Sequence, residues 1–434
     1  MAEQMKPSGI EWIGDIPNDW KIQRFKFCGA VLYGCPFNSD FFTNEDTGIP
    51  LIRIRDITSG TISTYYEGHY SSEYMVHSGD VLVGMDGDFN VRIWDNLDAL
   101  LNQRCCKILS SKKINARYLA YYLPHQLYIV NQLTWSTTVK HLLAEDIGNI
   151  PVAYPQLNEQ KAIADFLDKE CAQIDSIAAD LEKQIALLQQ YKKSLITETV
   201  TKGLDKSVPM KDSGLEWLGK IPAHWNFKRL KFMLENSSDS MKVGPFGSAL
   251  SGSDFTDEGK WVYNQRVVLD NNFSENTTFV SEEKFQEMRS FAVYPGDILI
   301  TTRGTIGKVA IVPEGANEGI LHPCIIKFRV DKEMIIPELL QLIFNESDFV
   351  KDQFTLMSNA TTIEVIYSYS LKDILLPVIP ADEQEKIYGY LSKKCIAIDG
   401  IISEKQKALA TIIQHKKSLI YEYVTGKKRV KEVQ

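Results

Sequence analysis

The stretch that decides the fold covers residues 158–204 and reads NEQKAIADFLDKECAQIDSIAADLEKQIALLQQYKKSLITETVTKGL. Leucine or isoleucine recurs at every seventh position and Glu, Lys and Gln fill most of the remainder, which predicts a helix with one narrow apolar stripe. No glycine or proline interrupts the run before Gly203. Roughly 43 residues form a rod of about 65 Å, and a rod with so narrow a stripe requires a partner helix. The stripe consists of Leu167, Ile174, Leu181, Leu188 and Leu195, with Ile163, Ile177 and Ile185 in the intervening steps.

A second stretch, residues 382–424, supplies that partner, because it repeats the pattern and many identities at a shift of 224 positions, as from Glu159 to Glu383. The repeated elements are a Glu-Gln pair, an Ile-Asp pair and a Lys-Lys-Ser-Leu-Ile run. We therefore expect two copies of one helix that pack as an antiparallel coiled coil. The first copy carries Glu159-Gln160, Ile174-Asp175 and Lys192-Lys193-Ser194-Leu195-Ile196, and the second carries Glu383-Gln384, Ile398-Asp399 and Lys416-Lys417-Ser418-Leu419-Ile420.

The whole chain is duplicated, not the helix alone. The lead-in SGIEWIGDIP at residues 8–17 returns as SGLEWLGKIP at residues 213–222, and RFKF at 24–27 returns as RLKF at 229–232. Tryptophans recur in both lead-ins, and we interpret them as packing anchors against the helix ends rather than as base-stacking groups. They are Trp12, Trp20, Trp217 and Trp225.

The segments between lead-in and helix are divergent copies. SGDVLV at residues 78–83 matches PGDILI at residues 295–300, and each predicts a turn followed by a buried strand. Short β-rich runs alternate with one or two helical runs, so we expect an α+β fold of two similar α/β domains joined by two long helices, with a pseudo-twofold internal repeat. The expected division is a first domain at 1–157, a long helix at 158–204, a second domain at 205–380, and a second long helix with a basic tail at 381–434. Because the lead-ins and helices keep their residues while the middles differ, the chain is typical of a protein with two similar tasks on two different targets.

The composition, with 44% hydrophobic and 24% charged residues, is that of a soluble globular protein, and no run is long enough to cross a membrane. The first residues contain no apolar signal region, and the seven cysteines show no CxxC spacing, so we expect a cytoplasmic protein with reduced thiols. The net charge of −8 has the wrong sign for a protein that holds nucleic acid by bulk charge alone.

Motifs of the common enzyme classes are missing from the sequence. It contains no phosphate-binding loop, dinucleotide fingerprint, HExxH or GxSxG motif, and no Asn/Asp-Pro-Pro-aromatic tetrapeptide of amino-methyltransferases. Asp80 and Asp297 occupy equivalent places, but a Gly-Asp before an apolar strand is usually a turn aspartate that bonds its own backbone. These features argue against an enzyme, and the histidines show no metal-ligand spacing.

Three doubled elements resemble those of the DNA-specificity subunit of type I restriction–modification systems. They are the Ser-Gly-x-Glu-Trp-x-Gly-x-Ile-Pro lead-in, the Glu-Gln helix entry and the Lys-Lys-Ser-Leu-Ile-x-Glu-x-Val-Thr helix exit, and the resemblance covers essentially the whole chain. It implies two target-recognition domains, each reading one half of a split double-stranded DNA sequence, and helices that set the spacing and dock partners. The implied partners are two methyltransferase (modification) subunits and two restriction/translocase subunits in a bacterial or archaeal cell. These would bind S-adenosylmethionine, ATP and Mg, while this chain would bind no cofactor and catalyse nothing.

Polar and cationic residues on expected turns are the candidate DNA contacts of the first domain, since Arg reads guanine and Asn or Gln reads adenine through paired hydrogen bonds. Arg53 and Arg55 alternate with Ile52 and Ile54, so we expect both on one side of a strand, facing phosphate or solvent. For the other candidates a solvated turn is the alternative, and helix capping is a further one for the threonines. These candidates are Asn102, Gln103 and Arg104 on one turn, Asp86, Asp88, Asn90 and Arg92 on a loop, and Thr137, Thr138, Lys140 and His141 ahead of the helix.

Arg303 is the first candidate of the second domain, because it stands at the turn that follows the strand DILI. A surface turn is again the alternative. The other candidates there are Gln265, Arg266, Thr302, His322, Thr361 and Thr362.

Apolar residues off the helix stripe are candidates for partner docking, because a two-helix coil cannot bury them all. We expect the doubled lysine pairs at 192–193 and 416–417 on a solvated helix face, with phosphate contact as the alternative, and a disordered basic tail at Lys427-Lys428-Arg429. The docking candidates are Ile163, Phe166, Leu187, Ile196, Ile402 and Ile420.

Two other functions stay open at this point. A coiled-coil scaffold whose two domains bind protein or peptide would select no DNA sequence. A self-sufficient nuclease or methyltransferase would show turnover by the lone chain that depends on a metal or on S-adenosylmethionine.

Overall fold

The computed structural model describes residues 4–133, 140–215, 217–246, 249–358 and 365–430 of the chain. It divides into two compact units, residues 1–182 with 407–434, and residues 183–406. We call the part of the first unit that precedes the first long helix the first head, and the part of the second unit between the two long helices the second head. Among the described residues, no helix has the length and apolar character needed to cross a membrane.

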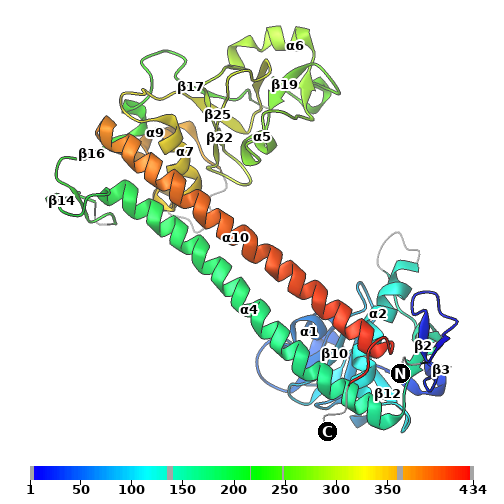
Figure 1. The fold of residues 1–434 in the computed structure, drawn as a ribbon. Helices are drawn as coiled ribbons and strands as arrows, with labels where there is room; N and C mark the ends of the chain where they lie inside the picture. Colours follow the sequence, from blue (N-terminus) through cyan, green and yellow to red (C-terminus); the bar gives the residue numbers. More distant parts are fainter. Residues whose placement is uncertain (1–3, 134–139, 216, 247–248, 359–364, 431–434) are drawn as a thin grey trace. The chain divides into compact units, whose positions relative to one another are not determined.

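The first head is built on a four-stranded and a five-stranded sheet. It is the part of the ribbon drawn in blue to cyan in Figure 1. Parallel pairing joins β6 to β11, and the other strand pairs of these sheets are antiparallel. The first sheet has the order β10 (Val91–Ile93), β9 (Val81–Gly84), β12 (Cys105–Ser110), β4 (Gly29–Tyr33), and the second has the order β5 (Phe42–Thr43), β7 (Tyr65–Tyr66), β6 (Ile49–Ile52), β11 (Ala99–Leu101), β8 (Met75–Val76).

Helices and short ladders complete the first head. The helix α2 (Ala116–Leu133) buries one face, including Tyr118 and Tyr122, in the same core as β9 and β12. The other elements are β1 (Met5–Pro7) paired with β2 (Asp15–Pro17), β3 (Lys21–Arg24) paired with β13 (Pro151–Tyr154), the short helices α1 (Ile54–Ser59) and α3 (Ala144–Asn149), and the 3-10 turns η1 (Phe25–Phe27), η2 (Ser39–Phe41) and η3 (Ser72–Tyr74).

The second head repeats this strand order. Its parallel pair is β19 with β24, which corresponds to β6 with β11. The sheets have the orders β23 (Val309–Ile311), β22 (Ile298–Thr301), β25 (Ile325–Phe328), β17 (Met241–Val243), and β18 (Phe255–Thr256), β20 (Phe279–Val280), β19 (Lys260–Tyr263), β24 (Gly319–Leu321), β21 (Ala292–Val293). The other elements are β14 (Met210–Asp212) with β15 (Lys220–Pro222), β16 (Asn226–Arg229) with β26 (Leu375–Val378), α5 (Gln265–Leu269), α6 (Glu282–Glu287), α7 (Pro337–Glu346), α8 (Phe349–Ser358), α9 (Ser368–Asp373), and the 3-10 turns η4 (Leu230–Phe232), η5 (Gly252–Asp254) and η6 (Arg289–Phe291).

The long helices α4 (Leu157–Lys202) and α10 (Ala381–Val424) pack on each other and run antiparallel. In the first unit Lys416 of α10 bonds Asp175 of α4, and in the second unit Lys192 of α4 bonds Asp399 of α10. The predicted α+β architecture with a doubled unit and an antiparallel helix pair is thus confirmed. The expectation of a solvated face is wrong for Lys192, which is buried because it lies in this pairing.

The Glu-Gln repeat ties each long helix to its head. Gln160 is fully buried, and its side chain accepts from Asn115 N at 2.8 Å and donates to the carbonyls of Lys113 and Pro155 at 3.0 and 2.9 Å. Gln384 accepts from Ile336 N at 2.9 Å and donates to the carbonyls of Met334 and Ile379 at 2.9 and 2.8 Å. Each glutamine side chain makes hydrogen bonds with three backbone groups. A shorter or apolar side chain could not make all three of these bonds.

Two of the four recurring tryptophans, Trp20 and Trp225, lie at the helix ends, as predicted. The other two, Trp12 and Trp217, are 38% and 40% exposed, and their rings contact Gln126 of α2 and Phe349 of α8 instead. Trp20 packs against the turn at Gly426, which ends α10, and Trp225 packs against Gly203, which ends α4. Both glycines have positive φ, a left-handed helix end that disfavours a side chain. The basic tail is ordered from Lys427 to Val430, so the expectation of disorder is wrong there: Lys427 Nζ donates to the Asp15 carbonyl, and Arg429 pairs with Asp19.

Candidate nucleic-acid interface

Most of the predicted DNA contacts of the first head come together where the strands β6, β9 and β11 end. Backbone hydrogen bonds join the segment after β6 to the β11–β12 turn (Asn102 N to Ile52 O, 3.2 Å) and that turn to the β9–β10 loop (Met85 N to Arg104 O, 3.0 Å). The same loop binds the segment before α3, through Leu142 N to Met85 O at 2.7 Å. Four segments far apart in the sequence thus form one continuous surface, which we call the reading face.

The second head builds its reading face with the same bonds. His322 N donates to Tyr263 O at 3.2 Å, Thr302 N to Cys324 O at 3.0 Å, and Ile366 N to Thr302 O at 2.9 Å. The backbone frame is therefore equivalent in the two heads while the side chains on it differ. The equivalent pairs are Met85 and Thr302, Asp86 and Arg303, Arg104 and Cys324, and His141 and Val365.

Arg53 and Arg55 do not alternate along a strand, so that expectation is wrong. β6 ends at Ile52 and α1 begins at Ile54, because Asp56 accepts from Arg53 N at 2.8 Å and caps the helix. Burial raises the pKa of Asp56, against the opposing effect of its hydrogen bond from Arg53 N. Both arginines are exposed, and Arg55 also donates to Thr64 Oγ1 at 2.9 Å.

The side chain of Arg92 makes hydrogen bonds within the first head. Its guanidinium lies 3.3 and 3.4 Å from the carbonyls of Ile57 and Thr58, near the end of α1, and so fixes that helix against β10. The predicted DNA contact does not fit this half-buried side chain, which is already committed to carbonyl groups. Asn90, by contrast, is exposed and donates to Thr58 Oγ1 at 3.2 Å.

Asp86 organises the centre of the first reading face. Its carboxylate lies 2.6 Å from His141 Nδ1 and 3.7 Å from Arg104 Nε. Gly87 N donates to the Lys140 carbonyl at 3.1 Å, and Lys140 Nζ lies 3.1 Å from Asn131 Oδ1. The acid therefore orients two donor side chains, while the neighbouring Gln103 is exposed and Asn102 is half-buried with its Oδ1 accepting from Gln103 N.

Arg303 holds the position in the second head that Asp86 holds in the first. Its side chain is exposed and makes no hydrogen bond or ion pair within the described parts of the chain. The turn beneath it is braced, since Gln265 Nε2 donates to Thr305 O at 3.3 Å and its side chain lies beside Gly304. Such a side chain is available to a ligand.

Thr302 is buried and His322 is half-buried, and the side chain of each makes a hydrogen bond with the backbone of Cys324. Thr302 is buried, and its hydroxyl donates to Cys324 O at 2.9 Å, so the predicted DNA contact of this side chain would require that bond to open. His322 Nδ1 accepts from Cys324 N at 3.1 Å, which leaves the proton of the neutral ring on Nε2. Burial lowers the pKa of His322, so the neutral ring, with one donor, is favoured.

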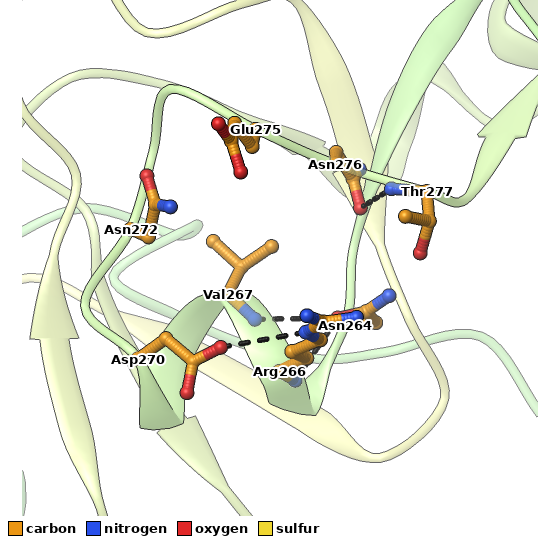
Figure 2. A pocket seen from close by; sticks show the side chains of 8 residues that line it. All are labelled: Asn264, Arg266, Val267, Asp270, Asn272, Glu275, Asn276 and Thr277. Atoms are coloured by element: carbon orange, nitrogen blue, oxygen red, sulfur yellow. Dashed lines mark hydrogen bonds and ion pairs between the residues drawn. The ribbon is translucent and has the colours of Figure 1, made fainter. Parts of the chain in front are cut away.

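Arg266 lies beside a small pocket at α5, as Figure 2 shows. Its Nε is 3.4 Å from Asp270 Oδ2, and the Asn264 side chain accepts from the backbone N of Arg266 and Val267. The guanidinium is exposed, so it is positioned for a solvent-side contact such as a phosphate. Four predicted contacts fall outside the described residues, namely Thr137, Thr138, Thr361 and Thr362.

The predicted docking residues are mostly covered. Ile163 and Ile196 are fully buried and Ile402 is 8% exposed, so their expected exposure is wrong. The reason is that Ile163 and Ile196 lie near helix ends, where a head covers the face that a bare coil would expose. Phe166 packs on Tyr423 with ring centroids 4.5 Å apart, Ile420 is half-buried in the same core, and Leu187 is exposed.

Other exposed apolar residues on the long helices were not among the predicted docking residues. Ile177 and Ile401 are equivalent at the shift of 224 and are 49% and 44% exposed. Ile177 was expected in the apolar stripe. The equivalence of Ile177 and Ile401 in the repeat is the sequence feature that could have identified both as docking candidates. Among the described residues, no group of three or more His, Cys, Asp or Glu side chains is placed to hold a metal ion.

Comparisons with known proteins agree with one another. The family model described as "Type I restriction modification DNA specificity domain" matches residues 34–187 and 242–410. The EcoBI specificity subunit of Escherichia coli is 30% identical over 98% of this chain and 90% of its own length, and the MjaVIII specificity subunit of Methanocaldococcus jannaschii is 26% identical over 96% and 95%. A solved structure concerned with complex assembly and conformational transition of the type I R-M system has a similar fold, with a TM-score of 0.67, 16% identity, and coverage of 95% of this chain and 99% of that one.

Proposed function

The chain belongs to the type I restriction modification DNA specificity family and is a specificity subunit of such a system, and from this premise we propose that each head reads one half of a split double-stranded DNA sequence. The observation that carries the proposal is the equivalent frame with unlike side chains: Asp86 and Arg303 occupy the same backbone position with opposite charge. An equivalent frame serves the same task in both heads, and unlike side chains select different bases.

The reading residues differ accordingly. In the first head Arg104, oriented by Asp86, pairs with guanine, while the exposed amide of Gln103 suits adenine. In the second head Arg303 takes the guanine role, and His322 offers one Nε2 proton to a base acceptor. Arg53, Arg55 and Arg266 contact phosphate and fix the register, a role that carries no sequence information.

The net charge of −8 shapes how the chain binds DNA. The cationic side chains on the reading faces contact nearby phosphates. The net negative charge of the whole chain, however, opposes long-range electrostatic attraction to the duplex. We infer that the isolated chain binds DNA weakly and that its complex with modification subunits, which add cationic surface, binds tightly and selectively.

The long helices act as spacer and as docking elements in this proposal. Each of them contributes residues to both units, so their length sets the separation of the half-sites. Exposed apolar side chains such as Ile177, Leu187 and Ile401 suit the docking of two modification subunits. Those subunits bind S-adenosylmethionine and methylate adenine, two restriction/translocase subunits use ATP and Mg, and this chain catalyses no reaction.

The test is selection from random-sequence duplex DNA by the chain in complex with its modification subunit. We expect enrichment of a bipartite motif with a fixed gap, and a methylome of the host should show the same motif with methyladenine. No enrichment would overturn the proposal and favour the scaffold whose heads bind protein. Turnover by the lone chain with S-adenosylmethionine or a metal would contradict its non-catalytic role.

A further inference from the structure

Two phenylalanines at equivalent positions are unusually exposed. Phe27 in the first head and Phe232 in the second are 64% and 63% exposed, although a buried anchor stands two residues before each of them. They end the 3-10 turns η1 and η4, whose first residues, Phe25 and Leu230, are fully buried. The turn therefore presents the aromatic ring outward in both heads.

One lysine lies close to each ring. Lys26 Nζ lies 5.6 Å from the centroid of Phe27, and Lys231 Nζ lies 5.2 Å from that of Phe232. An arginine three residues before each phenylalanine is held in place, since Arg24 donates to Asn149 Oδ1 at 3.3 Å and Arg229 bonds Asp373 Oδ1 at 3.1 Å. Asp373 also pairs with Lys231 at 3.3 Å. We call each set of Arg, Lys and Phe an aromatic corner. The two corners consist of Arg24, Lys26 and Phe27, and of Arg229, Lys231 and Phe232.

Each corner lies one short helix away from its reading face. In the first head the residue before α3, Leu143, follows Leu142, whose N–H bonds the β9–β10 loop, and the other end of α3 contacts η1 at Gly148 and Lys26. In the second head Ile366 bonds Thr302 ahead of α9, and Asp373 at its end bonds Arg229. A partner on a corner would thus stand next to the bases read by the same head.

The internal repeat favours a common ligand for the two corners. The reading faces have diverged to opposite charge at Asp86 and Arg303, whereas the Arg, Lys and Phe of the corners are identical at a shift of 205. DNA backbone is common to both half-sites as well, but it offers no apolar cavity for a phenyl ring. A protein pocket covers such a ring and gains from desolvation, and a carboxylate rim matches the two cations.

We propose that the two aromatic corners are equivalent docking surfaces, each taking one copy of the modification subunit through an apolar pocket rimmed by carboxylates. This proposal rests on the proposed function, which supplies the partner. The corner adds to contacts on the long helices and fixes each modification subunit beside the half-site read by the same head.

The experiment uses the full chain and the purified modification subunit, with Phe27→Ser, Phe232→Ser and the double variant. Tyr128→Ser on α2 is the matched control, because that ring is 61% exposed in the first head and lies outside the corner. Binding isotherms and native mass spectrometry measure the affinity and the number of modification subunits bound. Thermal unfolding of each variant verifies that the exposed substitutions leave the fold intact.

We expect each single variant to weaken one of the two binding events by about tenfold or more, the double variant to weaken both, and Tyr128→Ser to change neither. Lys26→Glu should weaken the same event as Phe27→Ser. Unchanged assembly in the corner variants overturns the proposal, and so does unchanged assembly with reduced DNA affinity, which would assign the corner to DNA. Failure of the proposed function gives a different result: a wild-type complex that assembles normally and selects no split sequence.

Discussion

Lys192 and Asp399 form an ion pair between the two long helices, with Nζ 2.8 Å from Oδ2, and Lys416 and Asp175 repeat it at 2.6 Å with the helices exchanged. The two pairs are the same residues at a shift of 224, so the pseudo-twofold repeat is visible at the level of single side chains. Their surroundings differ, because the Lys192 side chain is 11% exposed and that of Lys416 is 30% exposed. Burial disfavours the charged form of Lys192, but hydrogen bonds with Asp399 and Glu346 outweigh it and raise the pKa.

Lys192→Ala should therefore destabilise the chain more than Lys416→Ala. The first change leaves Asp399 and Glu346 facing a partly buried gap, for which we expect a loss of about 1–3 kcal/mol in the free energy of unfolding. The second should cost about 0.5–1 kcal/mol, since its partner Asp175 is mostly exposed. Urea unfolding followed by circular dichroism measures both, and Lys193→Ala, from an exposed pair with Asp348, is the control. Equal losses in the free energy of unfolding for Lys192→Ala and Lys416→Ala would contradict the greater burial of the Lys192 pair.

The buried amides at the helix entries lead to a second prediction. Gln160→Leu leaves the N–H of Asn115 and the carbonyls of Lys113 and Pro155 without their partner, so the free energy of unfolding should fall by about 2–4 kcal/mol. Gln384→Leu should give a similar loss in the second unit. Gln184→Leu, on an exposed part of α4, should change stability by less than about 0.5 kcal/mol. A small effect of Gln160→Leu would mean that the entry corner is held by other contacts.

The contacts between and at the ends of the long helices follow largely from the amino-acid sequence. The seven-residue period and the doubled Glu-Gln and Ile-Asp elements predicted the helix pair. The glutamines and aspartates of these elements make equivalent bonds in both copies. The turn aspartates were also predicted: Asp80 accepts from His77 N at 2.8 Å, and Asp297 from Tyr294 N at 2.9 Å. Hydrogen bonds between residues close in the sequence can be predicted from the sequence alone.

The sequence did not predict which side chains are buried by parts of the chain distant in sequence. Arg53 and Arg55 were expected on a strand, since a six-residue helix with alternating apolar residues has the period of a strand until its capping Asp56 is recognised. Ile163 and Ile196 were expected to be exposed, since a heptad does not reveal where a head covers the helix. Thr302 looked like its neighbour Arg303, yet beyond the end of β22 the first is buried with its hydroxyl bonded to Cys324 O and the second is exposed.

Arg303→Ala should weaken DNA binding by the complex by about 1–3 kcal/mol and relax selection at one position of the second half-site. The reason is that this exposed guanidinium has no partner among the described residues and stands on a braced turn. Selection from random-sequence DNA reads the outcome position by position. Arg266→Ala is the control and should weaken binding evenly, as a phosphate contact does. Even weakening by Arg303→Ala would reassign it to the phosphates.

Asp86→Asn should alter the first half-site alone. The change keeps the size of the side chain but removes the charge that holds His141 and Arg104, so selection at the base read by Arg104 should broaden about tenfold while the second half-site is unaffected. The neighbouring Asp88→Asn, on the same loop, is the matched control. If Asp86 instead acted by repelling DNA, its removal would strengthen binding to every sequence and leave selection unchanged.

His322 makes the stability of the second unit depend on pH. Burial lowers its pKa below the ordinary value of 6.5, so as pH falls through 6.5 the unfolded chain takes up a proton that the folded chain does not. The contribution of His322 to stability is therefore complete above about pH 7 and is lost progressively below 6.5. In His322→Asn the amide oxygen can still accept from Cys324 N, but nothing titrates. We expect the difference in melting temperature between parent and variant to be constant above pH 7 and to shift in favour of the variant toward pH 5. His125, whose pKa burial also lowers, is present in both proteins and cancels. A difference that stays constant from pH 8 to pH 5 would show that His322 titrates normally and that its ring is not held neutral by the frame.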